Sequence, residues 1–567
     1  MHVPRISWIS RNNRVNSKSQ CTCKILKLAV FTLLLFALYC ELSTWDGIVD
    51  PEENFKLRTA EDIKAYTKLF LEYGYNAWLS ERLPLRRELP DMRDSRCLNI
   101  KYDQDFELLN TVSIAVIFRN EQLETLLRMF HSLRDRTNMT LISELIVIND
   151  YSDKEFWLDK SSRDAFDAYL KHYITQNLQI FHTEDQMGLV RARRFAVRNS
   201  NFDIIIFVDA NVEFTDRWLE PMLTVLNHHE PTLVSPQIDR IDEQTLEYVR
   251  VEEHRGVFDW TLRRREVPLL QQQLKDMPNP FETPVPNTVV FGMDADLFNS
   301  LIHFDEDLNS PAAFEMQLSF YVWHQELRIV QVPCSRVAHL QPSDRSYLQR
   351  NGNMQQLAAQ QFSSYKRLVE IWLYNTKYKS FIYENHPQIK NAILGNISDV
   401  EEEYEYLPVL KSFDWYLENV APDLLQHFPL KARTDLANGT LRPAQQRTQC
   451  LTGDLQTNRI SLMPCDPSKR AAQHWTLSYM NDLRLGDNHC LEVQSNRKLA
   501  LSQCTTLAGP QNWHFDLNYN YLVSNTLCLE AHPKFFLMVR TCSTINAQQK
   551  WYFGRIRKDV IKANNFY

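Results

Sequence analysis

The stretch IIIFVDANVEF, residues 204–214, decides the fold of this chain. Three isoleucines, a phenylalanine and a valine lead into Asp209, and Asn211 follows two positions later. A short apolar run without alternation is typical of a strand buried on both faces of a parallel sheet. Because ligands of open α/β sheets bind beyond the carboxyl ends of the strands, Asp209 is a candidate metal- or ligand-binding residue.

Strand and helix patterns alternate before this stretch. Residues 112–118 and 144–150 are apolar and rich in β-branched side chains, and residues 123–136 have helical periodicity. This alternation predicts a βαβ series with a largely parallel sheet. Asp150 also ends a predicted strand, so we expect it to point into the same crevice as Asp209.

Two arginines lie between these acids along the chain, in GLVRAR (188–193). Beside a diphosphate site, Arg191 and Arg193 would neutralise phosphate charge. The alternative is that both are solvated charges on a helix surface. The pattern alone leaves both interpretations open.

The last 120 or so residues repeat. The tripeptides QHW, QNW and QKW end at Trp475, Trp513 and Trp551, which are 38 residues apart. Each unit also contains a cysteine pair, and these are Cys450 with Cys465, Cys490 with Cys504, and Cys528 with Cys542. Three hairpin-rich units with a fixed period and buried tryptophans predict a β-trefoil.

The composition is that of a globular protein with more than one domain. The chain has 567 residues and a formal net charge of −7, which argues against nucleic-acid binding as its main function. A basic leader precedes the apolar run LAVFTLLLFALYC (28–40), which predicts a cytosolic tail (1–27) and an uncleaved signal-anchor span (28–45). A cleaved secretory signal is the alternative.

Sequence features beyond the span indicate a luminal body. Of the eleven cysteines, eight follow the membrane-proximal region, an even number that fits full pairing in an oxidising compartment. Three N-glycosylation sequons begin at Asn138, Asn396 and Asn438. We therefore expect a luminal stem (46–105) followed by folded domains.

The motifs together resemble the polypeptide N-acetylgalactosaminyltransferase family. The resemblance runs from about Cys97 to the carboxyl end and includes SRCL, FRNE, IVIND, GLVRAR, DANVEF, VFDWTL, PCSRVAH, FDWYLENV and the Q-x-W repeats. It implies a GT-A α/β domain (106–428), a linker (429–447) and a ricin-type lectin domain (448–561). It also implies a disulfide between Cys97 and Cys334.

The resemblance implies a reaction and a set of site residues. Family members transfer N-acetylgalactosamine (GalNAc) from UDP-GalNAc to Ser or Thr with retention, the start of mucin-type O-glycosylation, and Mn²⁺ stabilises the leaving group. The metal positions correspond to Asp209, Asn211 and His339. The positions around the nucleotide sugar correspond to Asp150, Arg191, Arg119 and Tyr347.

Several of these positions depart from the family. Asn211 replaces a histidine ligand, so we expect Mn²⁺ binding to be weakened or lost. Phe314 replaces the glutamate of the WGGEN motif, and Glu315 lies one place further on, where a local backbone shift would let it serve. Thr288 and Val289 replace glycines that approach the sugar, and Pro342 replaces an arginine.

The lectin positions depart as well. Sugar binding in the family uses an acid, usually aspartate, after the CL pair of each repeat. These positions are Thr452, Glu492 and Glu530. The longer glutamate would displace a bidentate sugar contact, which favours a structural role for this domain.

The sequence therefore predicts an inactive or strongly impaired family member in the Golgi membrane, a single-pass type II protein with its body in the lumen. UDP-GalNAc or UDP and Ser/Thr-containing peptides are its expected partners if binding survives, with no nucleic acid. One alternative is an active transferase whose centre uses Glu315. A second is a lectin-like glycopeptide-binding protein.

Overall fold

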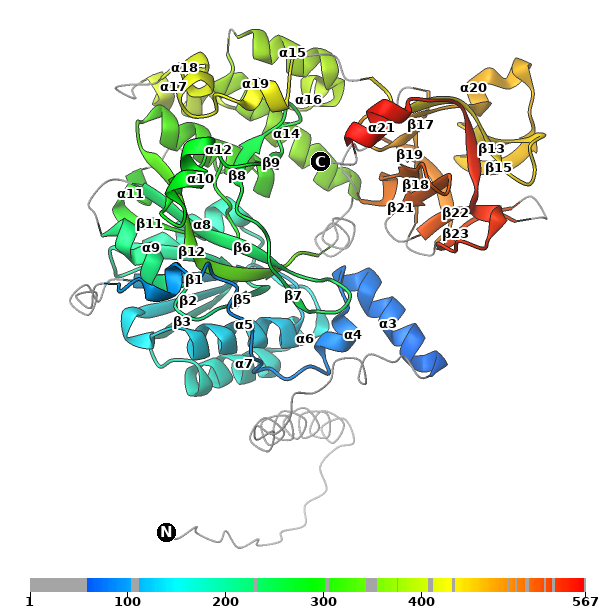
Figure 1. Ribbon diagram of the computed structural model, residues 1–567. Helices are drawn as coiled ribbons and strands as arrows, with labels where there is room; N and C mark the ends of the chain where they lie inside the picture. The colour runs from blue at the N-terminus through cyan, green and yellow to red at the C-terminus, as the bar shows by residue number, and fades with distance from the viewer. Residues whose placement is uncertain are drawn as a thin grey trace, which may run out of the picture.

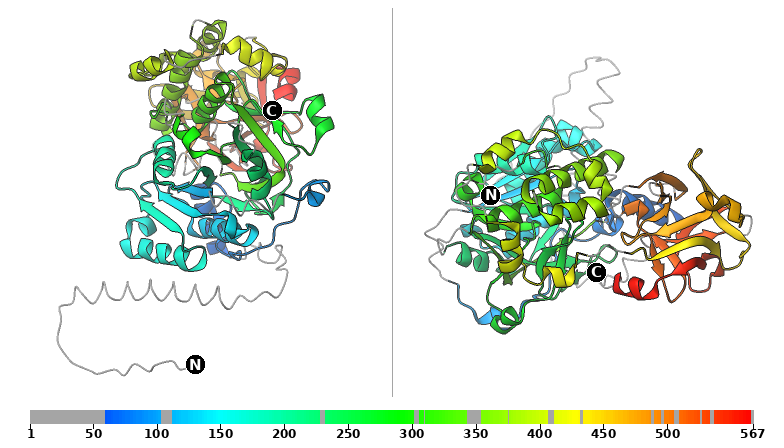
Figure 2. Two further views of the ribbon diagram at one scale, coloured as in Figure 1. Left: turned by 90° about the vertical axis from the view of Figure 1, so that its left-hand side faces the viewer. Right: turned by 90° about the horizontal axis from the view of Figure 1, so that it is seen from above.

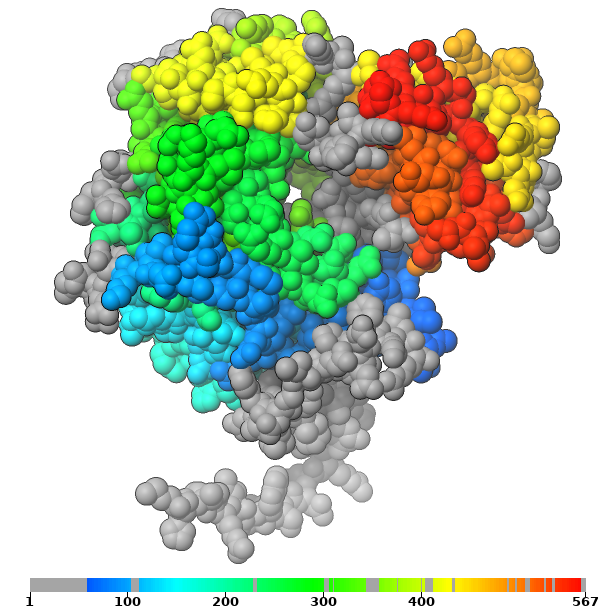
Figure 3. Space-filling view, viewed as in Figure 1, coloured from blue at the N-terminus to red at the C-terminus, as the bar shows by residue number. Residues whose placement is uncertain are grey.

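The computed structural model describes residues 59–102, 112–227, 232–300, 305–308, 310–342, 354–374, 376–405, 411–430, 434–486, 489–494, 497–504, 509–524, 527–532 and 536–564. An α/β body and a carboxyl-terminal β domain form two lobes (Figures 1 and 3). The predicted tail and anchor (1–45) and Tyr347 lie outside the described residues. Within those residues, no helix is both long and apolar enough to cross a membrane.

The α/β body is built on one mixed sheet with strand order β10-β12-β6-β11-β4-β1-β2-β3. The parallel half contains β1 (Val112–Phe118), β2 (Glu144–Asn149), β3 (Leu178–His182) and β4 (Ile204–Asp209). Strand β11 (Val290–Asp294) runs antiparallel to β4, and β12 (Arg328–Leu340) pairs in parallel with β6 (Thr232–Ile241). Strand β4 is the predicted apolar run, and its first five residues are buried.

Helices cover both faces of the sheet, which explains why the central strands β1 and β4 are almost entirely apolar. One apolar cluster joins alternate residues of β1 to α5 (Leu123–Arg136), α7 (Lys160–Tyr173) and α9 (Leu219–Leu226). A second cluster joins the other face to α8 (Leu189–Asn199), α12 (Pro311–His324) and α14 (Met354–Trp372). The right view in Figure 2 shows the β domain beside this body, whereas in the left view it lies behind the body. The predicted GT-A type of α/β fold is confirmed.

The remaining elements of the body are short. The strands are β5 (Val212–Phe214), β7 (Tyr248–Val249), β8 (Arg255–Phe258), β9 (Arg264–Val267) and β10 (Phe281–Glu282). The helices are α6 (Glu155–Leu158), α10 (Gln271–Asp276), α11 (Ala295–Ser300), α15 (Lys377–Asn385), α16 (Pro387–Asn391), α17 (Ser398–Glu405), α18 (Phe413–Asn419) and α19 (Leu424–His427).

A segment that the sequence assigns to the stem packs on the body. Helix α3 (Ala60–Tyr73) leads into α4 (Ala77–Ser80), and Trp78 and Leu79 are buried in one cluster with Leu340 of β12. The disulfide between Cys97 and Cys334 then ties this upstream chain to the same strand. The folded body therefore begins upstream of the predicted boundary at residue 106, because these apolar side chains complete its core.

The carboxyl-terminal domain is the predicted trefoil. Trp475, Trp513 and Trp551 are fully buried, and each donates its indole N–H to the carbonyl of the leucine in its own CL pair, with 2.8 Å between the two atoms in each case. The three predicted disulfides are present. Its elements are β13 (Ala437–Pro443), β14 (Gln449–Asp454), β15 (Arg459–Pro464), α20 (Arg470–Gln473), β16 (His474–Leu477), β17 (Leu483–Leu485), β18 (His489–Val493), β19 (Leu499–Gln503), β20 (His514–Asp516), β21 (Tyr521–Ser524), β22 (Leu527–Ala531), β23 (Leu537–Thr541), β24 (Trp551–Ile556) and α21 (Lys558–Asn564).

Candidate functional site

The three positions that the family uses for metal meet where β4 leaves the sheet. Asp209 ends β4, and its N–H donates to the carbonyl of Val289 at 2.9 Å. The Asn211 side-chain amide donates to the carbonyl of Leu340 at 2.6 Å, and the Leu340 N–H donates back to the Asn211 carbonyl at 3.0 Å. His339, the residue before Leu340, pairs with β5. The predicted candidates therefore converge, and the Asn211 amide is fixed on the backbone.

Burial changes the acid–base properties of this cluster. It raises the pKa of Asp209 to about 7, an effect that the charge of Arg193 opposes and the charges of Glu315 and Glu121 reinforce. Burial also lowers the pKa of His339 to about 4, so its imidazole is neutral at neutral pH. The centre therefore brings the half-buried carboxyl groups of Asp209 and Glu315 and the buried Glu121 close enough to influence one another.

Phe314 belongs to the hydrophobic core. Ser310 caps α12 by accepting the N–H of Ala313 at 3.4 Å, Pro311 occupies the first turn, and the Phe314 N–H donates to the Ser310 carbonyl at 3.0 Å. A proline at this position favours helix formation, and the two alanines that replace the family's glycines do so as well. As a result Phe314 is 0% exposed.

Glu315 points instead toward the loop that precedes β11. It accepts a hydrogen bond from the Thr288 hydroxyl at 3.1 Å. Burial raises the pKa of Glu315, and the charge of Arg264, the hydrogen bonds from Thr288 and the charge of Arg193 oppose this. Thr288 occupies a position where the family has a glycine beside the sugar. In this chain, the Thr288 side chain fills that position and contacts Glu315.

Arg193, which the sequence left with the same two interpretations as Arg191, is a central residue of this site. Its guanidinium donates to the Thr288 carbonyl at 3.1 Å and lies 4.5 Å from the centroid of the Phe314 ring. It also lies 5.0 Å from the centroid of Phe291. The sequence did not predict that Arg193 is buried. The signal for burial was its position on the helix, three residues before the apolar pair Ala196 and Val197.

The predicted nucleotide-sugar residues have partners within the protein. Both carboxylate oxygens of Asp150 accept backbone N–H groups, from Met187 at 2.7 Å and Gly188 at 3.0 Å. These bonds hold the loop that starts α8. Arg119 contacts Asp153 at 3.4 Å between nitrogen and oxygen.

Arg191 lies on the surface of α8. Its guanidinium contacts Asp307 at 2.8 Å and Glu306 at 3.5 Å, and Arg194 also pairs with Glu306. The side chain of Arg191 is 47% exposed, so these ion pairs are screened by water. The sequence analysis did not identify Glu306 and Asp307 as partners of Arg191. Both belong to the acidic run DED (305–307), which lies just before α12.

A second set of residues links the upstream segment to the cleft. The hydroxyl of Tyr75 donates to Glu121 of the FRNE motif at 3.1 Å and approaches the Thr125 hydroxyl at 3.0 Å. Tyr75 is fully buried. Glu121 in turn acts on Asp209 through its charge. The segment before residue 106 therefore orients an acid of the centre.

In the trefoil, the acids after the CL pairs are hydrogen-bonded to the scaffold. The Gln511 amide donates to Glu492 at 3.0 Å, and the Gln549 amide donates to Glu530 at 3.1 Å. Thr452 accepts from the Gln473 amide in the same way, at 2.9 Å. These are the glutamines of the Q-x-W tripeptides, so the three positions share one structural role.

The three sequons lie in different surroundings. Asn138 and Asn396 are exposed in turns. Asn438 is half-buried in β13, which pairs with β16 on one side and β24 on the other. The surroundings favour a glycan at the first two positions over the third.

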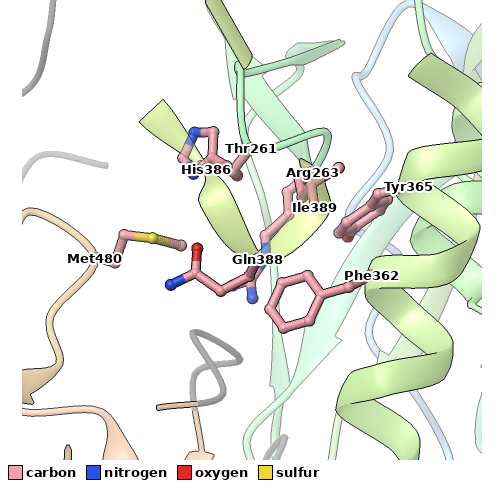
Figure 4. Close-up of a pocket in the computed structure, with 8 residues that line it drawn as sticks. All are labelled: Thr261, Arg263, Phe362, Tyr365, His386, Gln388, Ile389 and Met480. Carbon is pink, nitrogen blue, oxygen red and sulfur yellow. The ribbon is translucent and has the colours of Figure 1, made fainter. Parts of the chain in front are cut away.

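A small cavity marks the junction between the two lobes (Figure 4). Its volume of about 10 Å³ is enough for roughly one water. Only Met480 comes from the trefoil, and the lining comprises Thr261, Arg263, Phe362, Tyr365, His386, Gln388, Ile389 and Met480. Close by, the Tyr479 hydroxyl donates to the Asn385 carbonyl at 3.3 Å. The cavity therefore belongs to the domain contact and contains none of the predicted site residues.

Sequence comparison defines the class of both domains. Residues 113–298 match the family described as "Glycosyl transferase family 2", and residues 437–551 match the "Ricin-type beta-trefoil lectin domain". The chain is thus a glycosyltransferase-type protein with a ricin-type lectin domain.

Individual relatives identify the family. The chain is 39% identical over 500 residues to a Drosophila melanogaster protein described as "Putative inactive polypeptide N-acetylgalactosaminyltransferase 12", covering 86% of this chain and 88% of the relative. It is 32% identical to "Polypeptide N-acetylgalactosaminyltransferase 8" of Drosophila melanogaster, covering 81% and 76%. The chain belongs to the polypeptide N-acetylgalactosaminyltransferase family.

A solved relative supports the fold. A crystal structure of GalNAc-T7 with UDP, GalNAc and Mn²⁺ aligns with a TM-score of 0.60 and 24% identity, covering 91% of this chain and 95% of that one.

The residues of this chain at the three metal positions differ from the donor set of the family. Asn211 contributes a neutral amide whose nitrogen bonds to the backbone, leaving one carboxylate and one imidazole at the three positions. Within the described ranges, no group of three or more His, Cys, Asp or Glu side chains is arranged to hold a metal ion.

Proposed function

We propose that this chain is a catalytically inactive polypeptide N-acetylgalactosaminyltransferase that keeps the family scaffold. The main observation is the position of Phe314. The carboxylate that the family places there is replaced by a phenyl ring that is buried in the core, and a ring neither accepts a hydrogen bond nor carries charge. The name of the 39% identical relative, which includes the word inactive, supports the same function.

Two further observations support this proposal. Thr288 places a β-branched side chain where the family has glycine, and it engages Glu315. The metal positions lack the family's second histidine. Catalytic groups that act as a unit fail together when one is lost, so the loss of the carboxylate at position 314 is expected to remove most of the activity by itself.

An active enzyme with an altered centre is the second candidate, because Glu315 does point into the site. Its hydrogen bond to Thr288 and its electrostatic influence on Asp209 place a carboxyl group close to the family's reacting groups. A lectin-like role is less supported, since Glu530 is buried and bonded to the scaffold.

The deciding experiment is a transfer assay. The full-length protein is incubated with UDP-GalNAc, Mn²⁺ and a panel of Ser/Thr peptides, beside an active relative and a Glu315→Gln variant. We expect neither peptide transfer nor donor hydrolysis. Transfer that disappears in Glu315→Gln would establish the second candidate instead.

The cellular setting is also proposed. A single-pass type II protein of the Golgi membrane, with its body in the lumen, fits four disulfides in the described chain. Co-localisation of the tagged protein with Golgi markers, and protection of its carboxyl end from protease in sealed vesicles, would test this.

A further inference from the structure

An exposed tyrosine of the trefoil lies beside an arginine on the strand pair β13 and β24. Arg442 of β13 is directly opposite Tyr552 of β24 in the antiparallel register. Both side chains are exposed, and Tyr552 is 39% exposed, whereas their neighbours Pro443 and Trp551 are buried. Because directly opposite residues point to the same side of a strand pair, Arg442 and Tyr552 lie together on its outer face.

A second arginine reaches the same tyrosine from the loop between β13 and β14. The guanidinium carbon of Arg447 lies 5.0 Å from the centroid of the Tyr552 ring. The Ala444 N–H anchors this loop by donating to the Lys550 carbonyl at 2.8 Å. The Gln446 side-chain amide anchors it again by donating to a carbonyl of the β22–β23 turn at 3.3 Å. The tyrosine ring therefore has one guanidinium from the strand pair and one from an anchored loop beside it.

Neither arginine forms an ion pair in the part of the chain that the structure describes. Arg442 donates from Nε to the Thr440 hydroxyl at 3.1 Å, and Arg447 contacts the tyrosine ring. Elsewhere in the same domain, Arg484 pairs with Asp482 at 2.7 Å between nitrogen and oxygen. A guanidinium carries five N–H donors and keeps its charge. Two exposed cations at one aromatic ring are therefore available to an external anion.

The outer face of β24 carries no side chain next to the tyrosine. Gly554, two residues beyond Tyr552, is on the same face and is exposed. A Cβ at this position would meet the Gly439 Cα at 3.3 Å and the Thr440 nitrogen at 3.4 Å, so the close approach of β13 favours glycine here. This leaves room for a flat ligand over the strand pair beside the tyrosine ring.

The chemistry of this surface fits a ligand with one apolar face and one carboxylate. The C–H groups of a pyranose ring pack on an aromatic face, and a carboxylate accepts two parallel N–H bonds from a guanidinium. Both cations contact or oppose the same ring, which suits a compact ligand better than an extended acidic peptide.

We propose that the surface formed by Arg442, Arg447 and Tyr552 binds a glycan that ends in a carboxylated sugar, such as a sialic or uronic acid. This inference goes beyond the proposed function and does not depend on it, because a protein without transferase activity can still bind a glycan. The surface is separate from the positions after the CL pairs, whose side chains are bonded to the scaffold.

The first test compares acidic and neutral sugars. The full-length protein in detergent is first treated with an N-glycosidase, because a glycan on Asn438 would stand on the same strand pair. Sialyllactose, a glucuronate-ended disaccharide and neutral lactose are then titrated, with binding followed by saturation-transfer NMR. We expect at least one acidic sugar to bind about tenfold tighter than lactose or better, and to weaken as the salt concentration rises. Binding of neither acidic sugar, or equal binding of lactose, would overturn the proposal.

The second test uses variants of exposed residues, which are expected to fold. Arg442→Gln and Arg447→Gln each remove one cation, and Tyr552→Ser removes the ring, so each should weaken binding of the acidic sugar by about tenfold. The control is Arg459→Gln, which removes an exposed arginine from β15 and should bind like the wild type. Melting temperatures of the variants confirm that they are folded. If both arginine variants bind as tightly as the wild type, the proposal is wrong.

The third test separates a glycan from an acidic peptide as the ligand. A polyglutamate peptide is added to the complex with the acidic sugar, and we expect no displacement at equal concentration. Displacement at a tenfold lower peptide concentration, with peptide binding lost in Arg447→Gln, would make this a peptide-binding surface and overturn the proposal. The transfer assay tests the proposed function separately, since its outcome does not depend on Arg442, Arg447 or Tyr552.

Discussion

Glu315 and Thr288, which both depart from the family pattern, are hydrogen-bonded to each other, with 3.1 Å between the hydroxyl and carboxyl oxygens. Neither substitution alone would produce this contact. The threonine supplies a donor where glycine has none, and the half-buried glutamate accepts it. The two changes therefore compensate each other structurally at the place where the family binds a sugar.

This pairing predicts energetic coupling between the two residues. Thr288→Val keeps the shape of the side chain but removes the donor, so we expect a loss of about 1–2 kcal/mol in the free energy of unfolding. In the Glu315→Leu background, the same change should cost about 1 kcal/mol less. Urea unfolding of the four proteins measures the coupling, and additive effects would show that the contact contributes nothing to stability.

Restoring the family glutamate at position 314 should not restore catalysis. Phe314→Glu places a charged group in a closed part of the core, with an expected loss of more than about 3 kcal/mol. Phe314→Leu is the control and should cost about 1 kcal/mol. Denaturant unfolding together with the transfer assay checks both. A stable Phe314→Glu variant that transfers GalNAc would show that this single residue blocks the reaction.

The sequence could predict what depends on repeated or periodic patterns. The apolar run before Asp209 predicted the central strand, and the 38-residue spacing of Trp475, Trp513 and Trp551 predicted the trefoil. Both features recur along the chain and need no knowledge of tertiary contacts. The cysteine pairs of the repeats followed from the same spacing, whereas Cys97–Cys334 was implied only by the family resemblance.

The rest of the site depends on contacts between distant segments. Tyr75 contacts Glu121, and Arg191 contacts Asp307. The partners of Arg193 come from β11, from the loop before it and from α12. The sequence around an arginine on a helix can be the same whether its side chain contacts a ligand, a carboxylate or an aromatic ring. Tertiary packing alone decides between these, which is why the sequence left Arg191 and Arg193 with two open interpretations each.

His324 predicts a pH dependence that is independent of the metal positions. It is 3% exposed, and burial lowers its pKa to about 4, whereas an unfolded histidine titrates near 6.5. Between these values the unfolded chain binds more protons, so stability is complete above pH 6.5 and falls as the pH drops toward 4. The contribution of His324 to this loss should reach about 3 kcal/mol.

The variant His324→Phe isolates this contribution. The ring surroundings of Trp372 and Tyr416 accommodate an aromatic replacement. Unfolding free energies at pH 7 and pH 4.5 should differ less for this variant than for the wild type. The control, His172→Gln, changes an exposed histidine and should retain the wild-type difference. Identical slopes for His324→Phe and wild type would contradict the prediction.

The sequons should differ in occupancy. A branched glycan needs free space around its asparagine, which Asn138 and Asn396 have and the half-buried Asn438 lacks. Mass spectrometry after enzymatic deglycosylation in ¹⁸O-labelled water should find the label at the first two sites and little at Asn438. Full labelling of Asn438 would mean that β13 tolerates a glycan at its surface.

Glu530 should stabilise the trefoil and should not bind sugar. It is 1% exposed and accepts from the amides of the buried Gln549 at 3.1 Å and the half-buried Asn546 at 2.9 Å, so Glu530→Ala removes one acceptor from each of these amides. The expected loss is about 2–3 kcal/mol in unfolding of the trefoil, followed by tryptophan fluorescence. Glu492→Ala, at the equivalent half-buried position of the second repeat, is the matched control and should cost less.

Because both acids already bond to the scaffold, neither change should alter binding to a glycan array. Specific GalNAc binding by the wild type that Glu530→Ala abolishes would instead make this acid part of a sugar site.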